Sequence, residues 1–172
     1  MFAGTGAVSC FFKAQGYDVF SNDWQYYSFV LTHAAIVLND YPKFKKLEAN
    51  LNLNQDQNSE PHLNILNYLN NLAEKPGQFS DYYSEGGSQN RLYFSKSNGQ
   101  KIQAIRDTIE SWKVNDHIDQ DEYLWLIACL IKAADKVANT ASVYGAYLKK
   151  IKKTAQATLT LEPYKIQESA SA

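Results

Sequence analysis

The chain is poor in the features that mark secreted and membrane proteins. Its two cysteines, Cys10 and Cys129, both lie in apolar surroundings, which favours buried free thiols in a reducing cytosol over a disulfide. The longest apolar run without a charge, residues 123–131, is far shorter than the roughly 20 residues that cross a bilayer. The N-terminus has no basic region followed by an apolar one. We therefore expect a cytoplasmic protein without a membrane partner.

A strong net charge is also lacking. The chain has 17 basic and 18 acidic residues, so its overall charge does not by itself indicate a nucleic-acid partner. Basic residues are nevertheless concentrated in residues 91–113 and 141–165, and any phosphate contact should come from these two segments. His62 has no second metal-type ligand at a useful spacing, so we expect no metal site.

The first 23 residues have the pattern of a nucleotide-binding turn. Gly4 and Gly6 allow a backbone turn to approach a ligand closely, and an apolar helix and a strand candidate at residues 18–21 follow them. The strand leads to Asp23, whose carboxylate can accept hydrogen bonds from ribose hydroxyls. A third glycine and a phosphate-binding lysine are absent from the turn, which favours a nucleoside and disfavours a dinucleotide-binding oxidoreductase. The alternative is a glycine turn that only packs a helix against a strand.

Apolar periodicity predicts four further helices. They cover residues 24–38, 59–72, 97–112 and 119–138, and the last is apolar on all sides. We expect residues 78–90 to form a loop and residues 91–94 and 158–161 to form short strands. The aromatic residues of the first of these helices are interpreted as core rather than as a stacking surface for a ligand. They are Trp24, Tyr26, Tyr27 and Phe29.

Residues 138–147 interrupt the last helical pattern with small polar residues, a glycine and two tyrosines. Four lysines follow within residues 149–153. Lysines bind phosphates, and amide and hydroxyl groups can contact base edges or phosphates, so this combination suits a surface that touches DNA. The alternative is a helix kink with a solvated basic end.

Three segments resemble one enzyme family. Phe2-Ala-Gly-Thr-Gly-Ala-Val8, followed by Asn22-Asp-Trp-Gln-Tyr-Tyr-Ser28, is similar to the S-adenosylmethionine motif of the D12 class of adenine-specific DNA methyltransferases. Residues 86–94 and 134–149 resemble segments that these enzymes carry before their catalytic motif. The resemblance implies an α/β, predominantly helical fold. Residues 1–40 would form a partial Rossmann-like βαβ unit that binds S-adenosylmethionine, residues 41–157 a helical insertion for DNA target recognition, and residues 158–172 a return strand and tail.

The chain departs from the family pattern in its prolines. The family holds the target adenine with an Asp/Asn-Pro-Pro-Tyr/Phe motif, whereas the four prolines here are all isolated. A strand and a motif that precede the glycine turn in the family are not found either. We therefore expect a fragment of a restriction-modification type methyltransferase that is truncated at both ends, has no catalytic residue and is inactive alone.

The resemblance assigns two groups of site residues. Phe2, Gly4, Gly6 and Asp23 would bind S-adenosylmethionine, with weak or lost affinity in the fragment. The other group would bind double-stranded DNA. Its members are Arg91, Asn139, Ser142, Tyr144, Lys149, Lys150, Lys152 and Lys153. The alternative is a noncatalytic DNA-binding or partner-completing module, either a gene remnant or half of a split enzyme whose catalytic motif comes from a second chain.

Overall fold

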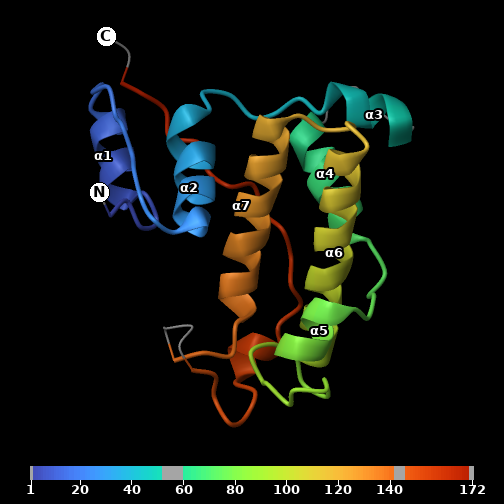
Figure 1. Cartoon of the computed structure of the whole chain (residues 1–172). Coiled ribbons are helices and arrows are strands. Elements are labelled where there is room, and N and C mark those ends of the chain that lie inside the picture. The colour runs from blue at the N-terminus through green and yellow to red at the C-terminus, as the bar shows by residue number, and fades with distance from the viewer. Residues whose placement is uncertain (1, 52–59, 142–145, 171–172) are drawn as a thin grey trace. The chain divides into compact units, whose positions relative to one another are not determined.

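The structure is a computed structural model that describes residues 2–51, 60–141 and 146–170. The described chain is mostly helical, which confirms the helical majority expected from the sequence (Figure 1). Its elements are α1 (Ala7–Ala14), α2 (Tyr26–Thr32), the π-helix η1 (His33–Val37), α3 (Lys45–Leu51), α4 (Pro61–Asn70), α5 (Gln78–Tyr83), α6 (Lys96–Val114), α7 (Gln120–Val137) and the 3₁₀-helix η2 (Lys153–Gln156).

The prediction of three strands is wrong: in the part of the chain that the structure describes, none of the three segments forms a strand. Residues 18–21, 91–94 and 158–161 are not assigned to strands, and pairing is limited to isolated bridges between Ser84 and Phe94 and between Thr140 and Tyr147. A strand exists only through hydrogen bonds to a neighbour. Residues 18–21 have strand-like composition but no partner strand among the described residues. The partial Rossmann-like unit is therefore not confirmed.

Two of the predicted helices, α4 and α7, begin at residues that favour a helix start and continue with the expected apolar periodicity. Pro61 begins α4, and α7 begins with a reciprocal capping pair. The Asp119 carboxylate accepts a hydrogen bond from the Glu122 N–H at 2.8 Å, and the Glu122 carboxylate accepts one from the Asp119 N–H at 2.9 Å. The sequence did not predict α3 or α5. Both have fewer than eight residues, which is too short for a clear helical period.

The chain folds as two compact units. The first contains residues 1–65, 112–129 and 163–172, and the second contains residues 66–111 and 130–162. In the first unit the indole of Trp125 is fully buried, lies 6.0 Å from the Phe44 ring and donates to the Tyr164 carbonyl at 3.1 Å. Cys129 is buried and Cys10 half-buried, and both are free thiols, so only Cys129 fits the expectation of full burial.

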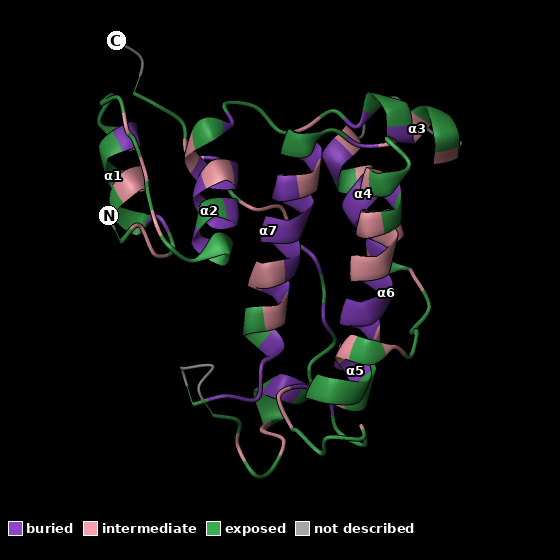
Figure 2. Ribbon diagram, in the orientation of Figure 1, coloured by how far each residue is buried: buried purple, intermediate pink, exposed green. Residues whose placement is uncertain are grey.

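The aromatic residues around α1 and α2 are exposed, which corrects their assignment to the core. Figure 2 colours much of α1 as exposed or intermediate, whereas α7 is largely buried. Trp24 and Phe20 have 91% and 97% of their surface exposed. The apolar residues Val8, Phe11 and Phe12, which share one face of α1, are exposed too. The buried residues of α2 are instead Ser28, Val30, Leu31 and Thr32.

The core of the second unit is built on one stripe of α6. Ile102, Ile105 and Ile109 are buried at the spacing of a helical face. Also on α6, the buried Lys101 side chain donates from its ammonium group to the Asn70 carbonyl at 2.8 Å and to the Leu72 carbonyl. The lysine thereby binds carbonyls that the end of α4 leaves without helical partners. Burial lowers the pKa of Lys101.

The buried Asn98 and the half-buried Asn70 bind the irregular segment at residues 146–162. The Asn98 side chain donates to the carbonyls of Ala155 and Ala157 at 3.1 and 2.9 Å and accepts from the Leu159 N–H at 3.0 Å. On α4, the Asn70 amide pairs with the N–H and C=O of Leu161 in the same way, at 2.8 and 3.0 Å. These amide groups replace the hydrogen bonds that a neighbouring strand would supply.

We predict that Asn98→Ala destabilises the protein by on the order of 3 kcal/mol, because it removes three hydrogen bonds and leaves backbone groups unpaired in the interior. Urea unfolding followed by circular dichroism measures the change. The matched control is Asn71→Ala, which removes an exposed amide and should change the free energy of unfolding by less than about 0.5 kcal/mol. Equal effects of the two variants would contradict the role given to Asn98.

Candidate functional site

The structure brings together two of the four predicted cofactor residues. The Gly4 N–H donates to one oxygen of the Asp23 carboxylate at 2.9 Å, and the Gln25 N–H donates to the other at 2.9 Å. These backbone donors, that of Gln25 first, lower the pKa of Asp23. The carboxylate is therefore ionised at neutral pH, a form that accepts hydrogen bonds from hydroxyl groups.

The two glycines of the turn have different surroundings. Both have positive φ, 55° at Gly4 and 82° at Gly6. A Cβ at Gly4 would meet no atom within 4 Å, so the space in front of this residue is open. A Cβ at Gly6 would lie 3.0 Å from the methyl group of Thr32, so Gly6 allows α1 to pack against α2. Phe2 is 88% exposed. The open side of the turn is thus at Gly4 and Asp23.

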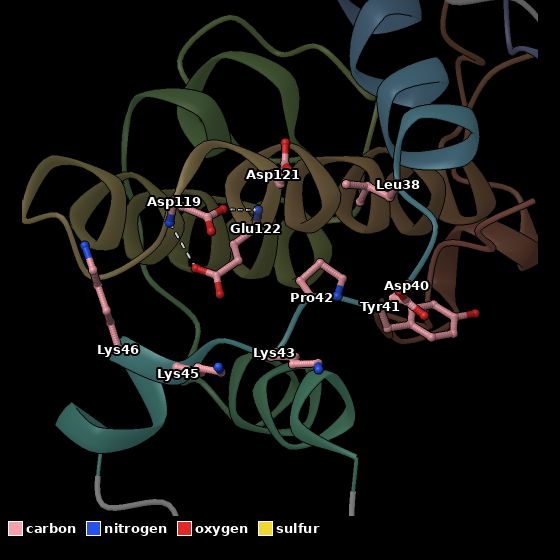
Figure 3. Close-up of a pocket in the computed structure, with 10 residues that line it drawn as sticks. All are labelled: Leu38, Asp40, Tyr41, Pro42, Lys43, Lys45, Lys46, Asp119, Asp121 and Glu122. Carbon is pink, nitrogen blue, oxygen red and sulfur yellow. Dashed lines mark hydrogen bonds between the residues drawn. The ribbon is translucent and has the colours of Figure 1, made fainter. Parts of the chain in front are cut away.

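A cavity of about 440 Å³ in the first unit lies elsewhere (Figure 3). None of the four predicted cofactor residues lines it. Three of its four acidic groups have partners: Asp119 and Glu122 form the capping pair of α7, and the Asp121 carboxylate lies 2.8 Å from Nε2 of His33. Burial raises the pKa of Glu122. The lining residues are Leu38, Asp40, Tyr41, Pro42, Lys43, Lys45, Lys46, Asp119, Asp121 and Glu122.

His62 is a packing residue in the first unit. Its ring stacks on Tyr41 with centroids 4.2 Å apart and meets Trp125 edge-on at 5.7 Å. Burial lowers the pKa of His62. Within the described residues, no group of three or more His, Cys, Asp or Glu side chains could hold a metal ion. The described helices also include none that is long and apolar enough to cross a bilayer.

Asn139 connects the two predicted DNA-binding segments of the second unit. It is completely buried two residues after the end of α7, and its side chain donates to the carbonyls of Leu92 and Leu148 at 2.8 and 3.0 Å. Its side-chain oxygen accepts from the Lys152 N–H at 2.9 Å, and its own N–H donates to the Tyr93 carbonyl at 2.7 Å. These bonds hold residues 92–93 beside residues 148–152.

The predicted lysines divide into two kinds. Lys149, Lys150 and Lys153 are exposed, and none of the ion pairs between described residues involves them. Lys152 is half-buried, and its ammonium donates to the Thr140 carbonyl at 2.9 Å. Ser142 and Tyr144 lie outside the described residues.

Sequence reasoning missed the aromatic side chains beside Arg91. The guanidinium carbon of Arg91 lies 5.8 Å from the centre of the Tyr83 ring, a cation–π distance. Tyr83 is on α5, which was expected to be a loop, and Tyr147 was one of the two tyrosines of the break but was not assigned as a DNA contact. The Arg91-Leu-Tyr-Phe94 segment carried the only available signal, since aromatic residues lie two and three positions after the basic residue.

Comparison with known proteins identifies the family. The profile of the D12 class N6 adenine-specific DNA methyltransferases matches residues 1–172, and the chain therefore belongs to this family. This confirms the resemblance seen in the three sequence segments. Members of the family generally use S-adenosylmethionine as the methyl donor.

The similar proteins include modification enzymes from several organisms. Type II methyltransferase M.NlaIII of Neisseria lactamica is 42% identical over 166 residues, which are 95% of this chain and 44% of that enzyme. Modification methylase StsI of Streptococcus sanguinis is 36% identical over 99% of this chain and 24% of its own length. Type II methyltransferase M.CviAII of Paramecium bursaria Chlorella virus 1 is 35% identical over 95% of this chain and 44% of its own length. The chain thus spans less than half of each of these relatives, and no solved structure matches it.

Proposed function

We propose that this chain is the cofactor-turn and target-recognition part of a site-specific DNA (adenine-N6) methyltransferase of a restriction-modification type system. The family membership and the names of its relatives support this function. The observation that carries the DNA-binding part is the buried Asn139, because its bonds place the segments bearing Arg91 and the free lysines beside each other. Double-stranded DNA is the proposed partner.

On the cofactor side, Gly4 and Asp23 fit one wall of a nucleoside-binding site. The open space at Gly4 leaves room for a ligand, and the ionised Asp23 carboxylate suits ribose hydroxyls. Gly6 would hold the turn against α2, and Phe2 would cover the ligand. S-adenosylmethionine supplies an activated methyl group when it is bound. Because a small-molecule site normally buries most of its ligand and Phe2 is 88% exposed, we propose that these residues alone bind it weakly.

On the DNA side, the residues take two roles. Arg91, Lys149, Lys150 and Lys153 would contact phosphates, since their charged groups are exposed. Asn139 and Lys152 would act by positioning, because the Asn139 amide is fully engaged with backbone groups and the Lys152 ammonium binds a carbonyl. Ser142 and Tyr144 remain proposed DNA contacts on sequence grounds.

A second candidate function is a module that needs further polypeptide to complete it. The exposed apolar face of α1 and the neighbouring Phe20 and Trp24 favour this alternative, because soluble chains rarely leave so many large apolar side chains uncovered. The covering polypeptide would supply the Pro-Pro motif that these 172 residues lack. It could belong to a longer form of the chain or to a second chain.

We predict that Lys149→Ala/Lys150→Ala weakens binding to duplex DNA and lowers the slope of log K against log salt by about 1.8, if each lysine neutralises one phosphate. Fluorescence anisotropy over a salt series measures this slope. The control is Lys43→Ala/Lys45→Ala, which removes the same charge from exposed positions in the first unit. If both double variants bind alike at every salt concentration, the phosphate contacts proposed for residues 149 and 150 are wrong.

We also predict that the isolated chain transfers no methyl group to DNA, because nothing in it matches the motif that holds the target amine. The assay uses labelled S-adenosylmethionine and an adenine-containing duplex. Incorporation above background that Asp23→Ala abolishes would contradict the prediction, since it would show a complete active site in these residues.

If the α1 face is normally covered, the isolated chain should self-associate through it. We expect Phe11→Ser/Phe20→Ser to lower the weight-average mass in sedimentation at a given concentration and to reduce binding of an apolar fluorescent dye. Tyr82→Ser serves as the control, because it removes an exposed aromatic from the second unit. If the parent chain stays monomeric and binds no dye, the second candidate function, a module that needs further polypeptide, is wrong.

A further inference from the structure

Three tyrosines of the second unit form a continuous row of rings. The Tyr83 and Tyr93 centroids are 5.9 Å apart, and those of Tyr93 and Tyr147 are 5.0 Å apart. Both pairs have interplanar angles of 64°, so the rings meet edge to face rather than stacking on each other. We call these three residues the tyrosine row. Because Tyr83 and Tyr147 each keep 37% of their surface exposed, the row is accessible to a ligand.

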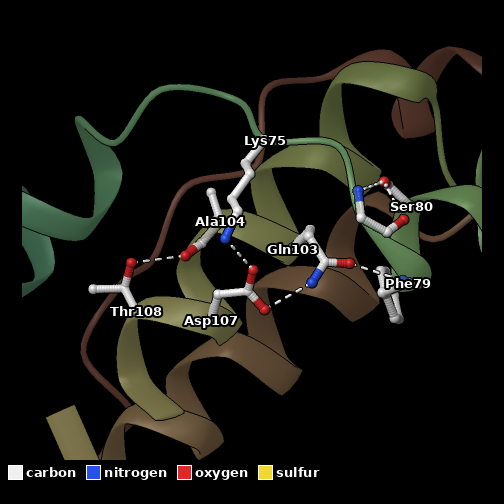
Figure 4. A network of polar contacts seen from close by, with 8 residues as sticks. Lys75, Phe79, Ser80, Gln103, Ala104, Asp107 and Thr108 are labelled. Atoms are coloured by element: carbon white, nitrogen blue, oxygen red, sulfur yellow. Dashed lines mark hydrogen bonds and ion pairs between the residues drawn. The ribbon is translucent and has the colours of Figure 1, made fainter. Parts of the chain in front are cut away.

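The first support of the row is the polar network that holds α5 (Figure 4). The Gln103 side chain accepts from the Phe79 N–H at 2.7 Å and donates to the Asp107 carboxylate at 2.7 Å. Lys75 pairs with the other oxygen of that carboxylate at 2.7 Å. Phe79 in turn packs against Tyr83, with centroids 5.2 Å apart. The Tyr83 end is therefore anchored to α6.

The second support is Asn139, which holds the other end of the row. Its backbone carbonyl accepts from the Leu148 N–H at 2.9 Å, and an antiparallel bridge pairs Thr140 with Tyr147. Its N–H donates to the carbonyl of Tyr93. Two neighbours in the row are thus placed by one buried residue, so the rings are arranged before any ligand arrives.

The charges around the row are mainly basic. The Arg91 guanidinium lies over Tyr83, and Lys149 and Lys150 follow Tyr147 closely in the chain. Of the nearby acids, the Asp81 carboxylate accepts hydrogen bonds from the N–H and hydroxyl of Ser88, and Glu85 is exposed. An aromatic surface with cations at both ends suits a nucleotide, whose flat base stacks and whose phosphates carry negative charge.

We propose that the tyrosine row binds an unstacked nucleobase of DNA while Arg91, Lys149 and Lys150 hold the flanking phosphates. The inference rests on the proposed function and adds a base-binding site to it. Stacking on an aromatic ring needs a base whose face is free, and a base inside a paired duplex has no free face. The site therefore distinguishes DNA that contains an unpaired base from continuous duplex.

The test compares two duplexes of the same length, one fully paired and one with a single unpaired base carried by the fluorescent analogue 2-aminopurine. The parent chain should bind the second roughly tenfold more tightly, and its fluorescence should fall as the base stacks on tyrosine. Tyr147→Leu should remove most of the preference, whereas Tyr147→Phe should keep it because the ring remains. Tyr82→Leu, an exposed tyrosine outside the row, is the matched control and should leave the preference unchanged.

The outcomes separate this inference from the proposed function. Equal binding to both duplexes, with the lysine-dependent salt slope intact, overturns the base site and leaves the DNA-binding function standing. A preference that survives Tyr147→Leu also overturns it. No binding to either duplex overturns both. Circular dichroism of each variant, with Tyr147→Phe as the fold-preserving substitution, shows whether a lost preference comes from the ring or from unfolding.

Discussion

The second unit depends on hydrogen bonds between asparagine side chains and the backbone of an irregular segment. Residues 146–162 contain only the short η2 and one bridge residue, yet Ala155, Leu159 and Leu161 in this segment are buried. Peptide groups taken out of water need partners, and here Asn70, Asn98 and Asn139 provide them. Each side chain uses both its amide donor and its carbonyl acceptor on this segment. The segment can therefore pack against the helices without forming a strand.

This constraint places the residues proposed to contact DNA. The Asn139 side chain is completely buried in this conformation and does not reach a base edge, and its bonds instead join the segment after Arg91 to the segment that carries the lysines. Lys152 supports the same junction through the Thr140 carbonyl. Within the region that the sequence pattern indicated, Asn139 and Lys152 bind backbone groups of the protein itself, and contact with DNA is proposed for their neighbours.

Local patterns predicted the features that depend on local physics. The α6 and α7 helices follow from apolar periodicity and from the capping pair of Asp119, and the meeting of Gly4 with Asp23 follows from the expected turn. Features set by distant residues were missed. Asn98 and Leu159 are 61 positions apart, and nothing in an asparagine's sequence neighbourhood indicates its partner. The strand at residues 18–21 failed for the same reason, since composition cannot supply a neighbouring strand. Trp24 and Phe29 were assigned to the core from helical spacing, which identifies an apolar face but not what covers it.

The two units thus differ in which side chains and backbone segments they leave uncovered. The first leaves aromatic side chains and a strand-like segment uncovered, and the second pairs its irregular backbone and presents basic and aromatic side chains. The central claim, that the second unit holds the DNA-binding face, is tested most directly by hydrogen exchange with and without duplex DNA. We expect DNA to slow exchange in residues 88–95 and 146–153 and to leave residues 17–29 unchanged. Protection confined to residues 17–29 would contradict this claim. So would a lack of protection in both residues 88–95 and residues 146–153 at saturating DNA.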